Sequence, residues 1–137
     1  MRVVTWNVNG LRSLHAQGYW DTFRTEVLFD VLCLQETKSD ISQLPPPLRS
    51  PEGIHAFFSS SRVKKGYSGV ATYTKQKPDK VEYGLGEERF DAEGRLITSY
   101  FDKLAILNAY VPNGGQGPHR LEYKLDFLDT LLVKDRK

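Results

Sequence analysis

Two short apolar runs on either side of an amphipathic stretch most limit the folds open to this chain. Val3–Asn7 and Val31–Gln35 carry apolar side chains on consecutive positions, which is typical of strands buried on both faces. Between them, apolar residues recur every three to five positions and predict one amphipathic helix, with Gly18 as its weak point. The order predicts a β-α-β unit whose two strands lie in the centre of a sheet.

Three further strands are predicted in the middle of the chain. The segments 55–60, 69–74 and Lys80–Tyr83 are separated by clusters of turn-forming residues, and together they predict a meander. The three prolines at 45–47, with Pro51, predict a loop or a short irregular connector, because proline cannot enter a helix interior.

A hairpin and a helix are predicted in the last third. Leu96–Phe101 and 104–110 flank a two-residue link of hairpin length, although Lys is a poor substitute for the Gly favoured there. After a glycine-rich loop, leucines at helical spacing form one apolar stripe: Leu121, Leu125, Leu128 and Leu132. Such a stripe usually packs against further structure, so we expect the domain to be unfinished at residue 137.

Composition restricts the class of protein. The 137 residues, 39% hydrophobic and 26% charged, match one soluble globular domain. A net charge of +2 excludes a uniformly basic, histone-like surface but allows a local basic patch. The single cysteine excludes an intramolecular disulfide, and we expect neither a secretory segment nor a membrane span. We expect the protein to be located in the cytoplasm, at the nucleoid, if it is bacterial, and in the nucleus or an organelle if it is eukaryotic.

Polar side chains follow both strands of the β-α-β unit. Asn7 and Asn9 stand where ligand contacts are common in α/β sheets, although Asn-Val-Asn-Gly is also a turn signature. Glu36 ends the second apolar run, where a carboxylate could anchor Mg²⁺, since this ion is held by as few as one or two protein carboxylates. The alternative is a strand-end Glu paired with Lys38.

Two later segments can also be interpreted either as part of a functional site or as ordinary structure. Lys64 and Lys65 precede Gly66-Tyr67-Ser68-Gly69, where glycines would let backbone amides approach a phosphate; a solvated turn is the alternative. Tyr110 and Asn113 follow the hairpin, and a lone strand-end tyrosine more often packs than reacts. The scattered histidines, and Cys33 inside a predicted core strand, argue against a zinc site or a thiol nucleophile.

Four motifs in order connect these features to one family. They are Thr5-Trp6-Asn7-Val8-Asn9-Gly10-Leu11-Arg12, Leu32-Cys33-Leu34-Gln35-Glu36-Thr37-Lys38, Gly66-Tyr67-Ser68-Gly69-Val70 and Asn108-Ala109-Tyr110-Val111-Pro112-Asn113. The chain resembles exonuclease III and the apurinic/apyrimidinic endonucleases, of the endonuclease/exonuclease/phosphatase superfamily. Two more segments, Asp91 to Arg95 and Arg120 to Lys124, are similar to its animal-type branch.

The resemblance implies an α/β fold, a two-sheet sandwich with outer helices. It also implies Mg²⁺-dependent hydrolysis of double-stranded DNA at abasic sites or 3′ ends, with Mn²⁺ as an alternative ion. No organic cofactor and no membrane association are expected. By position, the resemblance implies catalytic roles for Asn7, Tyr110 and Asn113 and metal contacts for Glu36 and Asn9. It also implies DNA contacts by seven residues: Arg12, Lys38, Gly66, Tyr67, Ser68, Gln116 and Arg120.

The chain departs from the family pattern in three ways. Asn9 replaces an Asp near the metal, and Gln116 replaces an Arg that enters DNA in some members. The Gly-Asp-x-Asn segment, a later Asp and a C-terminal Ser-Asp-His are missing, so we expect residues 1–137 to be the N-terminal part of one domain and inactive alone. The alternatives are a superfamily enzyme for another phosphodiester or phosphorylated lipid, and a non-catalytic DNA- or partner-binding module.

Overall fold

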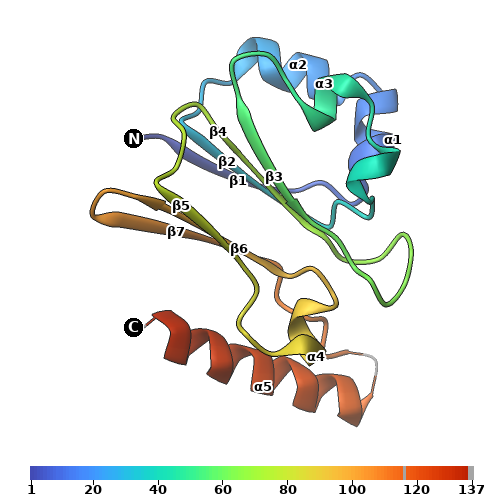
Figure 1. Ribbon diagram of the computed structural model, residues 1–137. Coiled ribbons are helices and arrows are strands. Elements are labelled where there is room, and N and C mark those ends of the chain that lie inside the picture. Colours follow the sequence, from blue (N-terminus) through green and yellow to red (C-terminus); the bar gives the residue numbers. More distant parts are fainter. Residues whose placement is uncertain (116, 136–137) are drawn as a thin grey trace.

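Two β-sheets lie face to face, with helices on the outer side of each (Figure 1). The computed structural model describes residues 1–115 and 117–135. The first sheet has the order β1-β2-β4-β3, in which β1 and β2 are parallel and the other neighbours antiparallel. The second is an antiparallel sheet of order β5-β6-β7. The predicted two-sheet α/β sandwich with outer helices is confirmed.

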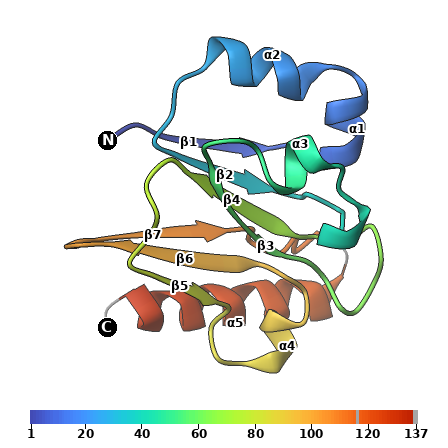
Figure 2. The ribbon, with the colours of Figure 1, turned by 45° about the horizontal axis from the view of Figure 1, so that its top comes forward.

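The strands and helices follow the chain in a simple order. The strands are β1 (Val3–Asn7), β2 (Val31–Gln35), β3 (His55–Ser59), β4 (Val70–Thr74), β5 (Lys80–Tyr83), β6 (Leu96–Phe101) and β7 (Leu104–Ala109). The helices are α1 (Leu11–Ala16), α2 (Tyr19–Glu26), α3 (Pro46–Arg49), α4 (Glu88–Asp91) and α5 (Pro118–Asp135), with a 3₁₀ turn at Ile41–Gln43. Figure 2 shows α1, α2 and α3 beside the first sheet and α5 along the second. No helix among the described residues is long and apolar enough to cross a membrane.

The alternation of side chains along β2 supplies both apolar layers. Leu32 and Leu34 face the helices and pack with residues such as Trp20, whereas Val31 and Cys33 face the second sheet. β2 lies between β1 and β4, as expected for a strand that is apolar on both faces.

One amide joins the two sheets. Asn108 of β7 is buried, and its Nδ2 donates to the main-chain oxygens of Ala71 in β4 (2.8 Å) and Leu34 in β2 (3.3 Å). Its Oδ1 accepts a hydrogen bond from Gln35 Nε2 at 2.9 Å. A buried polar group is stable only with such partners, so Asn108 fixes one relative position of the sheets.

Three predicted elements differ from the structure. The single helix is two helices, α1 and α2, because Gly18 has a left-handed φ of 84° between them. β1 is an edge strand within the described residues, where only Val4 and Trp6 pack against the core; the prediction of a central strand was wrong. Pro46 and Pro47 begin the short helix α3 instead of excluding a helix, because the first turn needs no proline N–H.

The meander also needs correction, whereas the hairpin and the C-terminal helix are as predicted. β3 pairs with β4 as predicted, but β5 belongs to the second sheet. The β6–β7 hairpin is confirmed, and Asp102 takes the left-handed conformation (φ 49°) that Gly would otherwise supply. Helix α5 is confirmed, yet it packs through Phe127 and Tyr123 against Phe90, and it leaves most of the leucine stripe exposed.

Candidate active site

The carboxyl ends of β1 and β2 bring Asn7 and Glu36 together. The two strands are parallel and Asn7 is opposite Gln35, so both strands end at the same edge of the sheet. Asn7 Nδ2 donates to Glu36 Oε1 at 3.1 Å. Glu36 has a φ of 54°, a conformation that is uncommon outside glycine and that turns the chain sharply after β2.

Lys38 and Asn9 complete this edge. Lys38 Nζ donates to Asn9 Oδ1 at 2.6 Å and lies 3.6 Å from Glu36 Oε2. The main-chain N–H of Asn9 donates to Asn7 Oδ1 at 3.1 Å. The Glu36–Lys38 pair considered as an alternative is therefore present, and it coexists with the Asn7 contact.

Tyr110 approaches the same carboxylate from the second sheet, where it directly follows β7. Burial, the hydrogen bond to Glu36 and the negative charge of Glu36 raise the pKa of Tyr110 to about 12. Burial opposes the ionisation of Glu36, but the hydrogen bonds from Asn7 and Tyr110 and the charge of Lys38 outweigh it, so the pKa of Glu36 is lowered. At neutral pH, the site pairs a carboxylate with a protonated phenol.

These side chains fit a single divalent ion. Glu36 offers one carboxylate and Asn9 one amide oxygen, and both already face the same cation, the Lys38 ammonium. Mg²⁺ needs only one or two protein carboxylates when water and substrate oxygens fill the other positions. Within the described residues, no three His, Cys, Asp or Glu side chains gather as a multidentate metal site.

A second group of side chains lies around Arg95, and we call Glu93, Arg95, Tyr67 and Arg120 the Arg95 cluster. Glu93 Oε1 accepts hydrogen bonds from Arg95 Nη2 (2.7 Å), Tyr67 Oη (3.2 Å) and Arg120 Nη2 (3.3 Å). Glu93 and Arg95 were not predicted as site residues from the sequence. Their signal was an opposite charge pair immediately before an apolar strand, inside a segment noted only for its family resemblance.

The predicted phosphate-binding loop is tied to the Glu36 edge. The main-chain N–H groups of Thr37 and Lys38 donate to the oxygens of Gly69 (3.1 Å) and Ser68 (2.9 Å). Ser68 is buried and donates its hydroxyl to Gly94 O at 3.4 Å, so its side chain supports the loop and does not face solvent. Gly66 is exposed next to it.

Arg12 and Asn113, two further predicted residues, have hydrogen-bond partners of their own. Arg12 is exposed in α1 and donates to Ser39 Oγ at 3.2 Å. Asn113 Oδ1 accepts a hydrogen bond from the Gly115 N–H at 2.9 Å, so its side chain takes part in a local turn. Gln116 lies outside the described residues.

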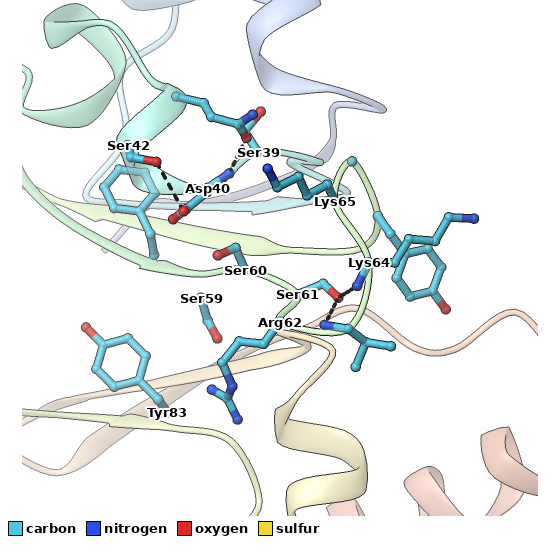
Figure 3. Close-up of a pocket in the computed structure, with 15 residues that line it drawn as sticks. Ser39, Asp40, Ser42, Ser59, Ser60, Ser61, Arg62, Lys64, Lys65 and Tyr83 are labelled. Carbon is cyan, nitrogen blue, oxygen red and sulfur yellow. Dashed lines mark hydrogen bonds between the residues drawn. The ribbon is translucent and has the colours of Figure 1, made fainter.

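One pocket lies beside the predicted phosphate-binding loop, and its lining does not include Asn7, Glu36 or Tyr110. It has a volume of about 750 Å³ and lies between the 39–43 segment, the 58–67 segment and Tyr83. Figure 3 shows the Lys65 side chain extending from its loop toward Asp40 and Ser39. Tyr67 and Gly66 line this pocket, so it adjoins the predicted phosphate-binding loop.

Comparison with known proteins places this geometry in a family. Residues 4–137 match the Endonuclease/Exonuclease/phosphatase family. The chain is 39% identical over 132 residues to the exodeoxyribonuclease of Bacillus subtilis, covering 96% of this chain and 51% of the relative. It is 43% identical over 125 residues to the DNA repair nuclease APEX1 of Danio rerio, covering 90% and 40%. The chain thus spans about half the length, or less, of these relatives.

Solved structures agree. The APE2 catalytic domain of Xenopus laevis matches with a TM-score of 0.79 and 34% identity, over 96% of this chain and 52% of that one. A 3′ phosphatase, NExo from Neisseria, bound to a product DNA hairpin, matches with a TM-score of 0.81 and 29% identity, over 99% and 52%. The chain belongs to the endonuclease/exonuclease/phosphatase family.

Proposed function

We propose that this chain is the N-terminal part of a Mg²⁺-dependent hydrolase of DNA repair, which cleaves phosphodiesters at abasic sites or 3′ ends. The observation that carries the proposal is the convergence of an ionised Glu36, Asn7 and a protonated Tyr110 on one edge of the sandwich. The names of the relatives, among them a DNA-(apurinic or apyrimidinic site) endonuclease of Dictyostelium discoideum, support the substrate class.

Each residue has a distinct task in this proposal. Glu36 and Asn9 hold the ion, which polarises a phosphoryl oxygen when bound. Asn7 keeps the Glu36 carboxylate oriented through its 3.1 Å hydrogen bond. Tyr110 donates its hydroxyl to a non-bridging phosphate oxygen, for which a phenol that stays protonated is suited. Lys38, Arg12, Arg120 and the Tyr67 loop bind the DNA backbone.

The same proposal makes the chain incomplete as a catalyst. Glu36 stands without a cluster of further acidic or histidine side chains in the described residues, and the relatives are about twice as long or longer. Loss of a general base or acid costs about 10²- to 10⁴-fold in rate. Residues 1–137 alone should therefore bind an abasic duplex and turn it over undetectably.

The decisive test compares residues 1–137 with the same chain extended by a family C-terminal half. Incision of an abasic duplex is measured against Mg²⁺ concentration for each protein with Glu36, with Glu36→Gln, and with Glu52→Gln as an exposed control. The extended Glu36→Gln protein should need far more Mg²⁺, because the amide keeps the shape but not the charge. Unchanged activity of that protein at limiting Mg²⁺ would contradict the metal role, and efficient incision by residues 1–137 alone would contradict the incomplete site.

Binding without turnover by the extended protein would instead favour the non-catalytic DNA-binding module. A substrate panel of abasic duplex, 3′-phosphate duplex and a phosphorylated lipid separates the nuclease from other members of the superfamily.

A further inference from the structure

A buried ion pair lies between the residues proposed to bind DNA and the residue proposed to contact the scissile phosphate. Arg95 is only 2% exposed, and its Nη2 lies 2.7 Å from Glu93 Oε1. A buried charge is costly unless it is paired and hydrogen-bonded. The partners of Arg95 therefore matter, and they come from both sides of the site.

The Arg95 guanidinium contacts Tyr110 and Tyr67 at the same time. Nη1 donates to the main-chain oxygen of Tyr110 at 3.1 Å, and the Tyr110 N–H donates back to Arg95 O at 2.8 Å. Nη2 donates to the Tyr67 hydroxyl at 2.8 Å. The guanidinium carbon also lies 5.1 Å from the centre of the Tyr110 ring and 5.7 Å from that of Tyr67. One planar group thus fixes the backbone of one residue and the side chain of the other.

Glu93 extends these contacts to helix α5. Its Oε1 accepts from Arg120 Nη2 at 3.3 Å, and Arg120 Nη2 also donates to the Tyr67 hydroxyl at 3.0 Å. Arg120 is the partly exposed member of the pair of arginines that share this carboxylate. Its guanidinium is thereby held facing Tyr67.

We propose that Glu93 and Arg95 are positioning residues, which hold the Tyr67 hydroxyl, the Arg120 guanidinium and the Tyr110 main chain as one pre-ordered group. The proposal rests on the proposed function and deepens it. It assigns to Glu93 and Arg95, which have no task in that function, the task of setting the distance between the residues that bind the DNA backbone and Tyr110. Lysine cannot replace Arg95 in this task, since a single ammonium lacks the planar fork that reaches three partners in different directions.

The test uses three variants of residues 1–137. Arg95→Lys keeps the charge but loses the fork, and Tyr67→Phe removes one hydroxyl from the cluster. Arg62→Lys is the matched control, because Arg62 forms a similar pair with Glu88 (2.6 Å) in which both side chains are exposed. Three quantities are measured: affinity for an abasic duplex, the NMR signals of the Tyr110 amide and the Arg120 side-chain N–H, and the midpoint of urea unfolding.

Coupled behaviour is the expected result. Arg95→Lys and Tyr67→Phe should each weaken duplex binding roughly threefold to tenfold. The affinity of the double variant should be at most about twofold lower than that of the weaker-binding single variant, because the effects of neighbours in one network are not additive. Both variants should shift the Tyr110 and Arg120 signals. Arg62→Lys should shift neither and should bind within about twofold of the parent.

Independent losses would overturn the proposal. If the fold-losses of the two variants multiply, or if the NMR signals of Tyr110 and Arg120 stay in place while only the unfolding midpoint falls, the pair merely stabilises the fold. If Arg95→Lys does not fold, Tyr67→Phe decides alone, through the Tyr110 and Arg120 signals. If the parent chain binds no duplex, the proposed function fails for this chain, and the NMR shifts still decide whether the positioning group exists.

Discussion

Glu36 and Tyr110 form a pair whose protonation can be followed directly. The raised pKa of Tyr110 means that the protonated phenol is favoured by the folded state, so its hydrogen bond to Glu36 is complete at neutral pH and is lost as the pH rises through about 12. We expect Glu36→Gln to lower the pKa of Tyr110, because the variant removes a negative neighbour. A titration of the Tyr110 ring carbon signal by NMR measures it; an unchanged pKa would mean that burial alone causes the shift.

At this scale the sequence was informative for residues that terminate strands. The place of Glu36 follows from the apolar run before it, and that of Tyr110 from the hairpin strand before it. Glu93 and Arg95 could not be recognised in the same way, because a buried charge is defined by partners far along the chain, such as Tyr67 and Arg120. Asn113 shows the converse: a motif residue whose side chain, in this structure, serves its own turn.

Gly18 is the residue on which the arrangement of α1 and α2 depends. It has a φ of 84°, and open space surrounds the position of a Cβ, so the cost of a side chain there is one of backbone strain alone. We expect Gly18→Ala to lower the free energy of unfolding by roughly 1 kcal/mol, the usual penalty of a left-handed non-glycine residue. Urea denaturation followed by circular dichroism tests this. A more stable variant would show that the two helices can merge into one.

The loop before β4 should contribute a salt-dependent part of DNA binding. Neither Lys64 nor Lys65 forms an ion pair with a carboxylate in the described part of the chain, and the Lys64 ammonium lies 6.0 Å from the Tyr67 ring centre. Removing both by Ala should flatten the plot of log K against log salt by about 0.9 per phosphate neutralised.

The control for this measurement lies at the other end of the same strand. Lys75 and Lys77 are exposed beyond the end of β4, and their replacement by Ala keeps the change in net charge identical. The slope of the control should match that of the parent. Equal slopes in both double variants would make Lys64 and Lys65 solvated surface charges, which was the alternative interpretation of this segment.

Elements were predictable where side chains alone define them. β2, the β6–β7 hairpin and α5 follow from runs and periodicities within one segment. The place of an element in the sheet order is a different matter. β1 has the apolar residues of a buried strand, yet it lies at the edge of the described sheet. β5 belongs to the second sheet because Lys80–Tyr83 pairs with β6 and not with β4. Partners, and not propensities, decide such placements.

For the whole molecule, the exposed side of α5 predicts self-association. Leu121, Leu125 and Leu132 are 48%, 53% and 52% exposed, and they follow one another along one helix face. Large contiguous apolar patches are rare on soluble monomers. We expect residues 1–137 to sediment as a concentration-dependent mixture of monomer and larger species.

One substitution pair tests the origin of this association. Leu125→Glu places a charge on the exposed face of α5, whereas Leu28→Glu places the same charge on a leucine outside that face that is even more exposed, at 69%. The first should shift the sedimentation profile toward monomer and the second should leave it unchanged. A monodisperse parent, or an equal effect of both substitutions, would contradict the role of the α5 face.

Asn108 has a consequence for catalysis that goes beyond its role in packing. It lies two positions before Tyr110, and its partner Gln35 lies one position before Glu36, so their 2.9 Å hydrogen bond joins the strand that ends at the carboxylate to the strand that ends at the phenol. If one sheet slipped past the other by two residues, Tyr110 would move about 7 Å along its strand and would no longer reach Glu36. The chemistry therefore depends on the alignment of the two sheets. In the extended protein, substitutions deep between the sheets should lower turnover before they disrupt the fold.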